Sequence, residues 1–248
     1  MEKLNLHTPQ KRKIIELQGQ IRAWERGSTA VFTTGCDALD ALLPSHGVRE
    51  GSLVEWLGNG DASGAGTLSL IAGRRVSPEG RRLVLIDTRH ELFALSLSLL
   101  GFDLSRLVLI RPASERQALW ACEEALRCEA VGLVWMSIER LTGTSFRRLQ
   151  LAAENSSGIG FLVRSAKAAC QPSWAEVRLK VQPRPFLRGS LCFQVEVAAS
   201  HGKPHHLKAN IMIDSLKGTL YGDTHSENSL SLVSRLAVAT THRRSAGA

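Results

Sequence analysis

The sequence predicts an α/β protein with a doubly wound, mostly parallel central sheet and an antiparallel extension. Between residues 52 and 164, short runs of residues alternate with helical segments. These runs are apolar almost throughout, as expected for strands whose two faces are both covered by helices. After residue 174 the runs alternate between apolar and polar residues, which is typical of antiparallel strands with one face in water.

The predicted elements follow one another in a regular order. Strands of the parallel part are expected at residues 53–57, 83–87, 107–110, 131–136 and 159–163. Helices are expected near residues 67–74, across 91–100, from Ser114 onward and across 145–154. Ser114 and Gln117 form a capping box, in which each side chain satisfies a free backbone amide. Alternating strands are expected at residues 175–181, 191–197 and 209–213.

Three regions are predicted along the chain: an N-terminal helix over residues 1–28, a core domain over 29–222 and a flexible tail over 223–248. The N-terminal helix is basic and amphipathic, with Ile14, Leu17, Ile21 and Trp24 at helical spacing. A lone helix cannot bury such a stripe by itself. We therefore expect this stripe to dock either on the core domain or on a partner chain.

Composition narrows the class of protein. Of the 248 residues, 44% are apolar, which supports a folded core. The N-terminus is polar and no run of about 18 apolar residues occurs, so we expect a cytoplasmic protein. The five cysteines form no C-x-x-C pair and are expected to be buried, reduced thiols. The net charge of +8 fits either a diffuse surplus or a binding face.

A glycine-rich loop follows the first strand of the predicted core, where nucleotide-binding proteins hold phosphate. A working loop reads G-x-x-x-x-G-K-[ST]. Here Gly58 and Gly64 are separated by five residues, Ala65 and Gly66 stand in place of the lysine and the hydroxyl, and Thr67 comes one place late. A lysine near a phosphate contributes roughly 4 kcal/mol, so its loss weakens binding on the order of a thousandfold. We expect no nucleotide cofactor.

The acids of a nucleotide hydrolase are also missing. The strand at residues 131–136 ends at Met136, without an aspartate, and Asp87 is followed two residues later by Arg89. Glu91 is expected only to cap or solvate its helix. The pair His205-His206 is expected to be incidental, so no metal site is predicted.

These segments, taken in order, resemble the RecA recombinase core over residues 34–58, 86–141 and 175–185. The resemblance places the Walker A lysine on Ala65, the following Ser/Thr on Gly66, the Walker B aspartate on Met136 and the catalytic glutamate on Arg89. It places the two DNA-binding loops, much shortened, at residues 142–145 and 165–173. Basic residues beside them are the candidate DNA contacts: Arg147, Arg148, Arg164 and Lys167.

A RecA-like chain without these groups resembles the ImuA family, most clearly at residues 111–127, 147–154 and 177–183. This resemblance implies a non-catalytic protein of SOS-induced mutagenic translesion synthesis, at the nucleoid. Its implied partners are ImuB, an error-prone C-family DNA polymerase and, as a further candidate, RecA. Two alternatives stay open: a SulA-like division inhibitor that binds FtsZ, and a divergent DNA-dependent ATPase that uses Thr67.

Overall fold

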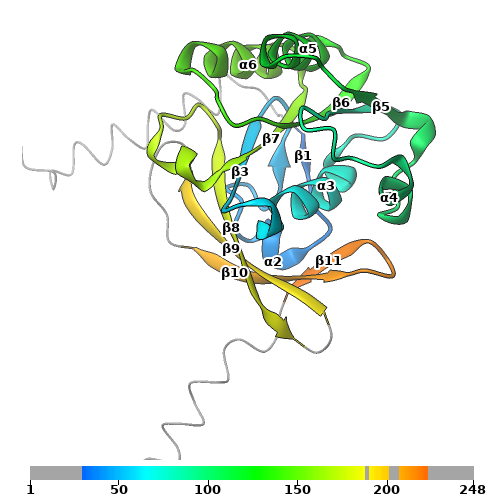
Figure 1. The fold of residues 1–248 in the computed structure, drawn as a ribbon, viewed down its shortest axis with the longest axis vertical. Helices are drawn as coiled ribbons and strands as arrows, with labels where there is room; N and C mark the ends of the chain where they lie inside the picture. Colours follow the sequence, from blue (N-terminus) through cyan, green and yellow to red (C-terminus); the bar gives the residue numbers. More distant parts are fainter. Residues whose placement is uncertain (1–29, 188–189, 201–206, 223–248) are drawn as a thin grey trace, which may run out of the picture. The chain divides into compact units, whose positions relative to one another are not determined.

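A nine-stranded mixed sheet forms the framework of the described domain (Figure 1). The computed structural model describes residues 30–187, 190–200 and 207–222. Its strand order is β11-β10-β9-β8-β3-β7-β6-β4-β5. The predictions for the N-terminal helix, the tail and His205-His206 fall outside the described residues.

Six neighbouring strands run parallel, and they form the half of the sheet that carries the glycine loop. In spatial order they are β8 (Val177–Leu187), β3 (Leu53–Gly58), β7 (Ile159–Ser165), β6 (Val131–Ser137), β4 (Arg82–Ile86) and β5 (Leu107–Ile110). The antiparallel part continues from β8 through β9 (Ser190–Ser200), β10 (Lys208–Asp214) and β11 (Thr219–Gly222). The predicted fold class is therefore confirmed.

Helices cover both faces of the parallel half. On one face, α5 (Glu115–Arg127) and α6 (Gly143–Ser156) lie side by side (Figure 1). On the other lies α3 (Ala65–Val76), with the shorter α2 (Asp37–Asp40) and α4 (Ala94–Leu99). Each face of the sheet has its own hydrophobic core, and successive residues of β6 point into opposite ones. Trp135 packs in the core under α3, and Met136 packs in the core under α5 and α6.

Short elements that the sequence did not predict complete the domain. A two-stranded ribbon of β1 (Val31–Phe32) and β2 (Val48–Arg49) precedes β3. Within the described residues, three 3-10 helices also form: η1 (Asp61–Ser63), η2 (Leu104–Arg106) and η3 (Ala166–Cys170). None of the helices in the described ranges is long and apolar enough to cross a membrane.

Local contacts explain where two helices begin. The Ser114 hydroxyl accepts from the amide of Gln117, whose side chain accepts from the Ala113 amide, so the capping box before α5 is confirmed. The helix predicted at residues 91–100 begins only at Ala94. The Asp87 carboxylate accepts hydrogen bonds from the amides of Glu91 and Leu92, which holds that segment as a loop.

The cysteine prediction is partly wrong. Cys36, Cys122 and Cys192 are buried, and all five cysteines are free thiols. Cys128 and Cys170 are exposed because each lies at the end of a helix, after α5 and in η3, where the chain turns at the surface.

Candidate functional site

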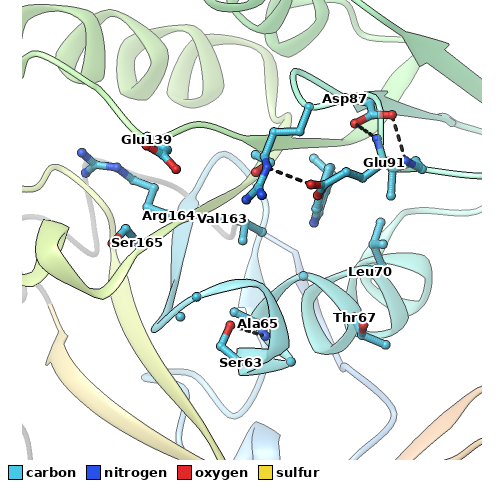
Figure 2. Close-up of a pocket in the computed structure, with 18 residues that line it drawn as sticks. Ser63, Ala65, Thr67, Leu70, Asp87, Glu91, Glu139, Val163, Arg164 and Ser165 are labelled. Carbon is cyan, nitrogen blue, oxygen red and sulfur yellow. Dashed lines mark hydrogen bonds and ion pairs between the residues drawn. The ribbon is translucent and has the colours of Figure 1, made fainter.

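A cavity of about 300 Å³ opens at the carboxyl ends of the parallel strands (Figure 2). The loop between β3 and α3 forms one side, and the others are formed by residues that follow β4 and by residues at the carboxyl ends of β6 and β7. Ligands of open parallel sheets bind at this edge. The cavity is therefore the counterpart of the nucleotide site that the glycine loop suggests.

The glycine loop is closed on itself by Ser63. The Ser63 side chain is 5% exposed, and its hydroxyl accepts from the Ala65 amide at 3.4 Å, as Figure 2 shows. The same hydroxyl lies so close to Gly58 that a Cβ at Gly58 would meet it at 2.1 Å. In a phosphate loop, such amides point at the ligand. A phosphate here would have to displace the Ser63 hydroxyl to reach the Ala65 amide.

The first turn of α3 does not supply the lysine charge or the inward-facing hydroxyl of a working phosphate-binding loop. Ala65 is 1% exposed and lies in the core. At Gly66, an added Cβ would meet no atom within 4 Å. Gly66 instead accepts from the Ser69 hydroxyl at 2.8 Å through its carbonyl. Thr67 is exposed at the first turn of the helix and lines the cavity. Two donors of a phosphate site, a lysine and an inward hydroxyl, are thus absent from these positions.

The carboxylate of Asp87, the residue after β4, holds the backbone of the loop that follows it. Asp87 is 2% exposed, accepts from the Glu91 amide at 3.0 Å and the Leu92 amide at 2.9 Å, and lies 3.7 Å from the Arg111 guanidinium. Arg89 lines the cavity and pairs with Glu91 at 3.0 Å. The expectation that Glu91 only caps or solvates its helix is wrong, because its carboxylate pairs with Arg89 beside the cavity.

Met136, which the RecA resemblance aligns with the Walker B aspartate, is not among the residues that line the cavity. Its side chain is fully buried in the core of α5 and α6, while its neighbours Trp135 and Ser137 face the cavity. The Trp135 indole donates to the Ser69 hydroxyl at 2.8 Å. Glu139 also lines the cavity and was missed from the sequence. Its place just beyond the carboxyl end of a parallel strand was the available signal.

Arg164 does not belong to a DNA-binding surface, so that prediction is wrong. Its side chain is 0% exposed and pairs with the equally buried Glu55 carboxylate at 2.7 Å. Its second terminal nitrogen donates to the Gln171 side chain at 2.7 Å. A buried carboxylate requires a cation or several donors, and Arg164 supplies that cation. Its charge is therefore used inside the protein.

The other candidate DNA contacts lie nearer the surface. Arg147 on α6 is half-buried, with its guanidinium 4.9 Å from the centre of the Trp174 ring. Arg148 is exposed and pairs with Glu123 of α5. Lys167 is exposed on η3. Of the two segments that the RecA resemblance aligns with DNA-binding loops, residues 142–145 begin α6 and residues 165–173 contain η3. Contact of Arg147, Arg148 and Lys167 with DNA stays a prediction.

Metal-binding clusters are absent from the part of the chain that the structure describes. No three His, Cys, Asp or Glu side chains there come together in an arrangement that could hold an ion.

Comparisons with known proteins identify relatives of the chain. The protein ImuA of Caulobacter vibrioides strain NA1000 is 32% identical over 149 residues, which cover 58% of this chain and 61% of that protein. RecA of Mesomycoplasma hyopneumoniae strain J is 33% identical over 106 residues, or 43% of this chain and 31% of that RecA. RecA of Streptomyces coelicolor is 33% identical over 104 residues, or 42% of this chain and 28% of that RecA.

The chain thus spans less than two thirds of each of these relatives. The family model of the RecA N-terminal domain matches residues 11–145, which is more than half of the chain. The chain belongs to the RecA N-terminal domain family.

Proposed function

We propose that this chain is a non-catalytic, ImuA-type accessory protein of SOS-induced mutagenic translesion DNA synthesis. It would act by binding ImuB and an error-prone C-family DNA polymerase, with RecA as a further candidate partner. Such a protein works in the cytoplasm, at the nucleoid. The similarity to ImuA supports the process, and the similarity to RecA supports the fold on which the partners would dock.

The single observation that carries the non-catalytic part is the closed glycine loop. The Ala65 amide already donates a hydrogen bond to the Ser63 hydroxyl, and Ala65 stands where the phosphate-binding lysine would be. Hydrolysis also needs an acid for the metal and an acid or amide for the water. Met136 lies in the core, and Asp87 is bonded to two amides of its own loop. Nucleotide binding and nucleotide hydrolysis are therefore each impaired, by changes at separate positions.

Calorimetric titration with ATP and Mg²⁺ tests this part of the proposal. We expect no saturable heat and no release of phosphate, with and without single-stranded DNA, while an active RecA serves as positive control. Micromolar binding together with turnover would contradict the proposal and favour the divergent ATPase. In that case Glu139→Gln should abolish turnover, because Glu139 is an exposed acid in the cavity that contains Thr67.

Partner binding needs a separate test. The tagged chain is purified from cells before and after DNA damage, with a tagged RecA-fold protein of another pathway as control. We expect ImuB and the C-family polymerase to co-purify after damage. Recovery of FtsZ without them, together with filamentation on overexpression, would favour the division-inhibitor alternative.

A further inference from the structure

A buried cluster of charges holds the segment after β7 against the sheet. Glu55 on β3 is fully buried, and its second carboxylate oxygen accepts from the Ser173 hydroxyl at 2.7 Å. That oxygen also lies 2.6 Å from the Arg178 guanidinium. Arg178 in turn donates to the carbonyls of Ala169 and Gln171, each at 3.1 Å. These contacts fix residues 169–173 without any ligand.

Trp174 is presented at the surface by this fixed segment. The residues on both sides are anchored: Ser173 bonds to Glu55, and Ala175 is buried and donates its amide to the Ser173 hydroxyl at 3.1 Å. The Trp174 side chain between them is nevertheless 47% exposed. Arg147 lies over its ring at 4.9 Å. A large aromatic side chain held in one place loses little conformational entropy when a partner binds it.

A pocket of about 410 Å³ lies beside this side chain. Residues 171–175 form it together with Arg178 and Ala199. Pro172, Trp174 and the two alanines contribute mostly apolar walls, with polar groups from Gln171 and Ser173. This volume is in the range of pockets that enclose a small ligand or a few side chains, about 300–1,000 Å³.

The cations around the pocket are too few for a nucleic acid strand. Arg178 directs its donors to Glu55 and to backbone carbonyls, and Arg148 pairs with Glu123. Near the pocket, Arg147 is half-buried and donates to the uncharged Gln150 side chain, while Arg148 and Lys167 are exposed. Nucleic acids are bound through many phosphate contacts. An apolar pocket with one or two cations beside it fits an apolar side chain next to a carboxylate.

We propose that the surface formed by Trp174, Arg147 and the adjoining pocket is a preformed docking site for a short peptide segment of a partner protein. The segment would insert an apolar side chain against Trp174 and place an acidic residue near Arg147. The site is complete without nucleotide, because Glu55, Ser173 and Arg178 hold it in shape. The inference deepens the proposed accessory function, on which it rests, by assigning the surface that a protein partner uses.

The test uses the full chain and a library of short random peptides displayed on phage. Binders are selected on the wild-type protein, with no prior subtraction on any variant. Selected peptides are synthesised with a fluorophore, and their affinities are measured by anisotropy. Trp120→Ala is the matched control, since Trp120 is 64% exposed on α5. Arg147→Glu and Arg116→Glu form a second pair, both on helices, so that a folding defect in Trp174→Ala does not leave the question open.

We expect selected peptides to share an apolar residue within a few positions of Asp or Glu. Trp174→Ala and Arg147→Glu should each weaken binding at least about tenfold, with Trp120→Ala and Arg116→Glu unchanged. Peptides that bind the Trp174→Ala and wild-type proteins alike would overturn the proposal. So would a labelled oligothymidylate that binds tightly, with steep salt dependence, and is lost in both Trp174→Ala and Arg147→Glu.

These outcomes are separate from the test of the proposed function. If ImuB co-purifies with the wild-type protein and equally with Arg147→Glu and Trp174→Ala, the accessory function stands and the docking site is wrong. If no translesion protein co-purifies but the peptides bind as expected, the docking site stands and the proposed process is wrong.

Discussion

At the scale of single residues, Glu55 organises the part of the domain that follows β7. It lies opposite Arg178 in the register of β3 and β8, and opposite Leu162 in the register of β3 and β7, two residues before Arg164. Side chains two apart on a strand share a face, so both guanidiniums converge on one carboxylate. The sequence alone could not show this, because Arg164 is 109 residues from Glu55.

Replacing this carboxylate should destabilise the protein strongly. Glu55→Gln keeps the side-chain size but leaves two buried arginines without their counter-ion. Breaking a buried pair in this way costs about 3–5 kcal/mol. Urea denaturation followed by circular dichroism should show that loss in the free energy of unfolding. Glu124→Gln is the control, because Glu124 forms an exposed pair with Arg127, and exposed pairs contribute about 0–1 kcal/mol. An equal effect of the two variants would contradict the internal role of Glu55.

The cysteines should separate into two reactive classes. Burial raises the pKa of Cys122 to about 12, with the Glu123 charge adding to the effect, and burial also raises the pKa of Cys36. Because the thiolate is the reactive form, Cys122 stays protonated and unreactive from pH 7 to pH 9, and Cys36 ionises less readily than an exposed thiol. Mass spectrometry after brief maleimide treatment should find label on the exposed Cys128 and Cys170. Label on Cys36, Cys122 or Cys192 should appear only after unfolding in urea, and native labelling of Cys122 would contradict the packing of α5.

At the scale of elements, apolar runs predicted the strands well, because the parallel half is covered on both faces. β5 has the bounds expected from the sequence. Elements shaped by distant contacts were less predictable. The late start of α4 depends on the Asp87 carboxylate, and β11, only four residues long, is ordered by pairing with β10. Which residues at the end of β6 face the cavity was also not predictable from residue type. The alternation of side chains along the strand places Trp135 at the cavity and Met136 in the core on the opposite face.

The loop between β3 and α3 depends on one glycine more than on another. Gly60 and Gly64 both have positive φ, 82° and 79°. A Cβ at Gly64 would lie 2.2 Å from the Phe193 ring of β9, whereas a Cβ at Gly60 would meet nothing within 4 Å. Gly60 has ψ 177°, a backbone conformation that is essentially restricted to glycine, so Gly60→Ala reports backbone strain alone, about 1–3 kcal/mol. Gly64→Ala should lower the free energy of unfolding further, by the overlap with Phe193.

A double variant separates strain from overlap. Gly64→Ala combined with Phe193→Ala should be less destabilised than the sum of the two single changes, because removing the ring relieves the overlap. Chemical denaturation of the four proteins in this cycle measures the coupling. Strict additivity would show that β9 does not support the loop.

At the scale of the whole molecule, β3 joins the two functional regions. Its carboxyl end leads into the glycine loop, and its middle residue, Glu55, fixes the segment that presents Trp174. In nucleotide-dependent proteins a ligand orders such segments. Here internal hydrogen bonds do this in both regions: the Ser63 hydroxyl closes the loop after β3, and the cluster around Glu55 holds residues 169–173. The domain is therefore built to hold a single arrangement without nucleotide.

This view predicts that restoring the lost side chains does not restore the ligand. In Ala65→Lys/Gly66→Thr the loop is still one residue too long, Ser63 still occupies the Ala65 amide, and Met136 is still in the core. A ligand at about 100 times its Kd stabilises the folded state by about 2.7 kcal/mol, which raises the Tm of a domain of this size by roughly 5–10 °C. Scanning calorimetry with ATP and Mg²⁺ should show no such rise in the wild-type protein or in the double variant. Mg²⁺ alone and inorganic triphosphate correct for ionic effects. A rise of about 5 °C confined to the double variant would show instead that the loop opens readily, and that the loss of lysine and hydroxyl alone emptied the site.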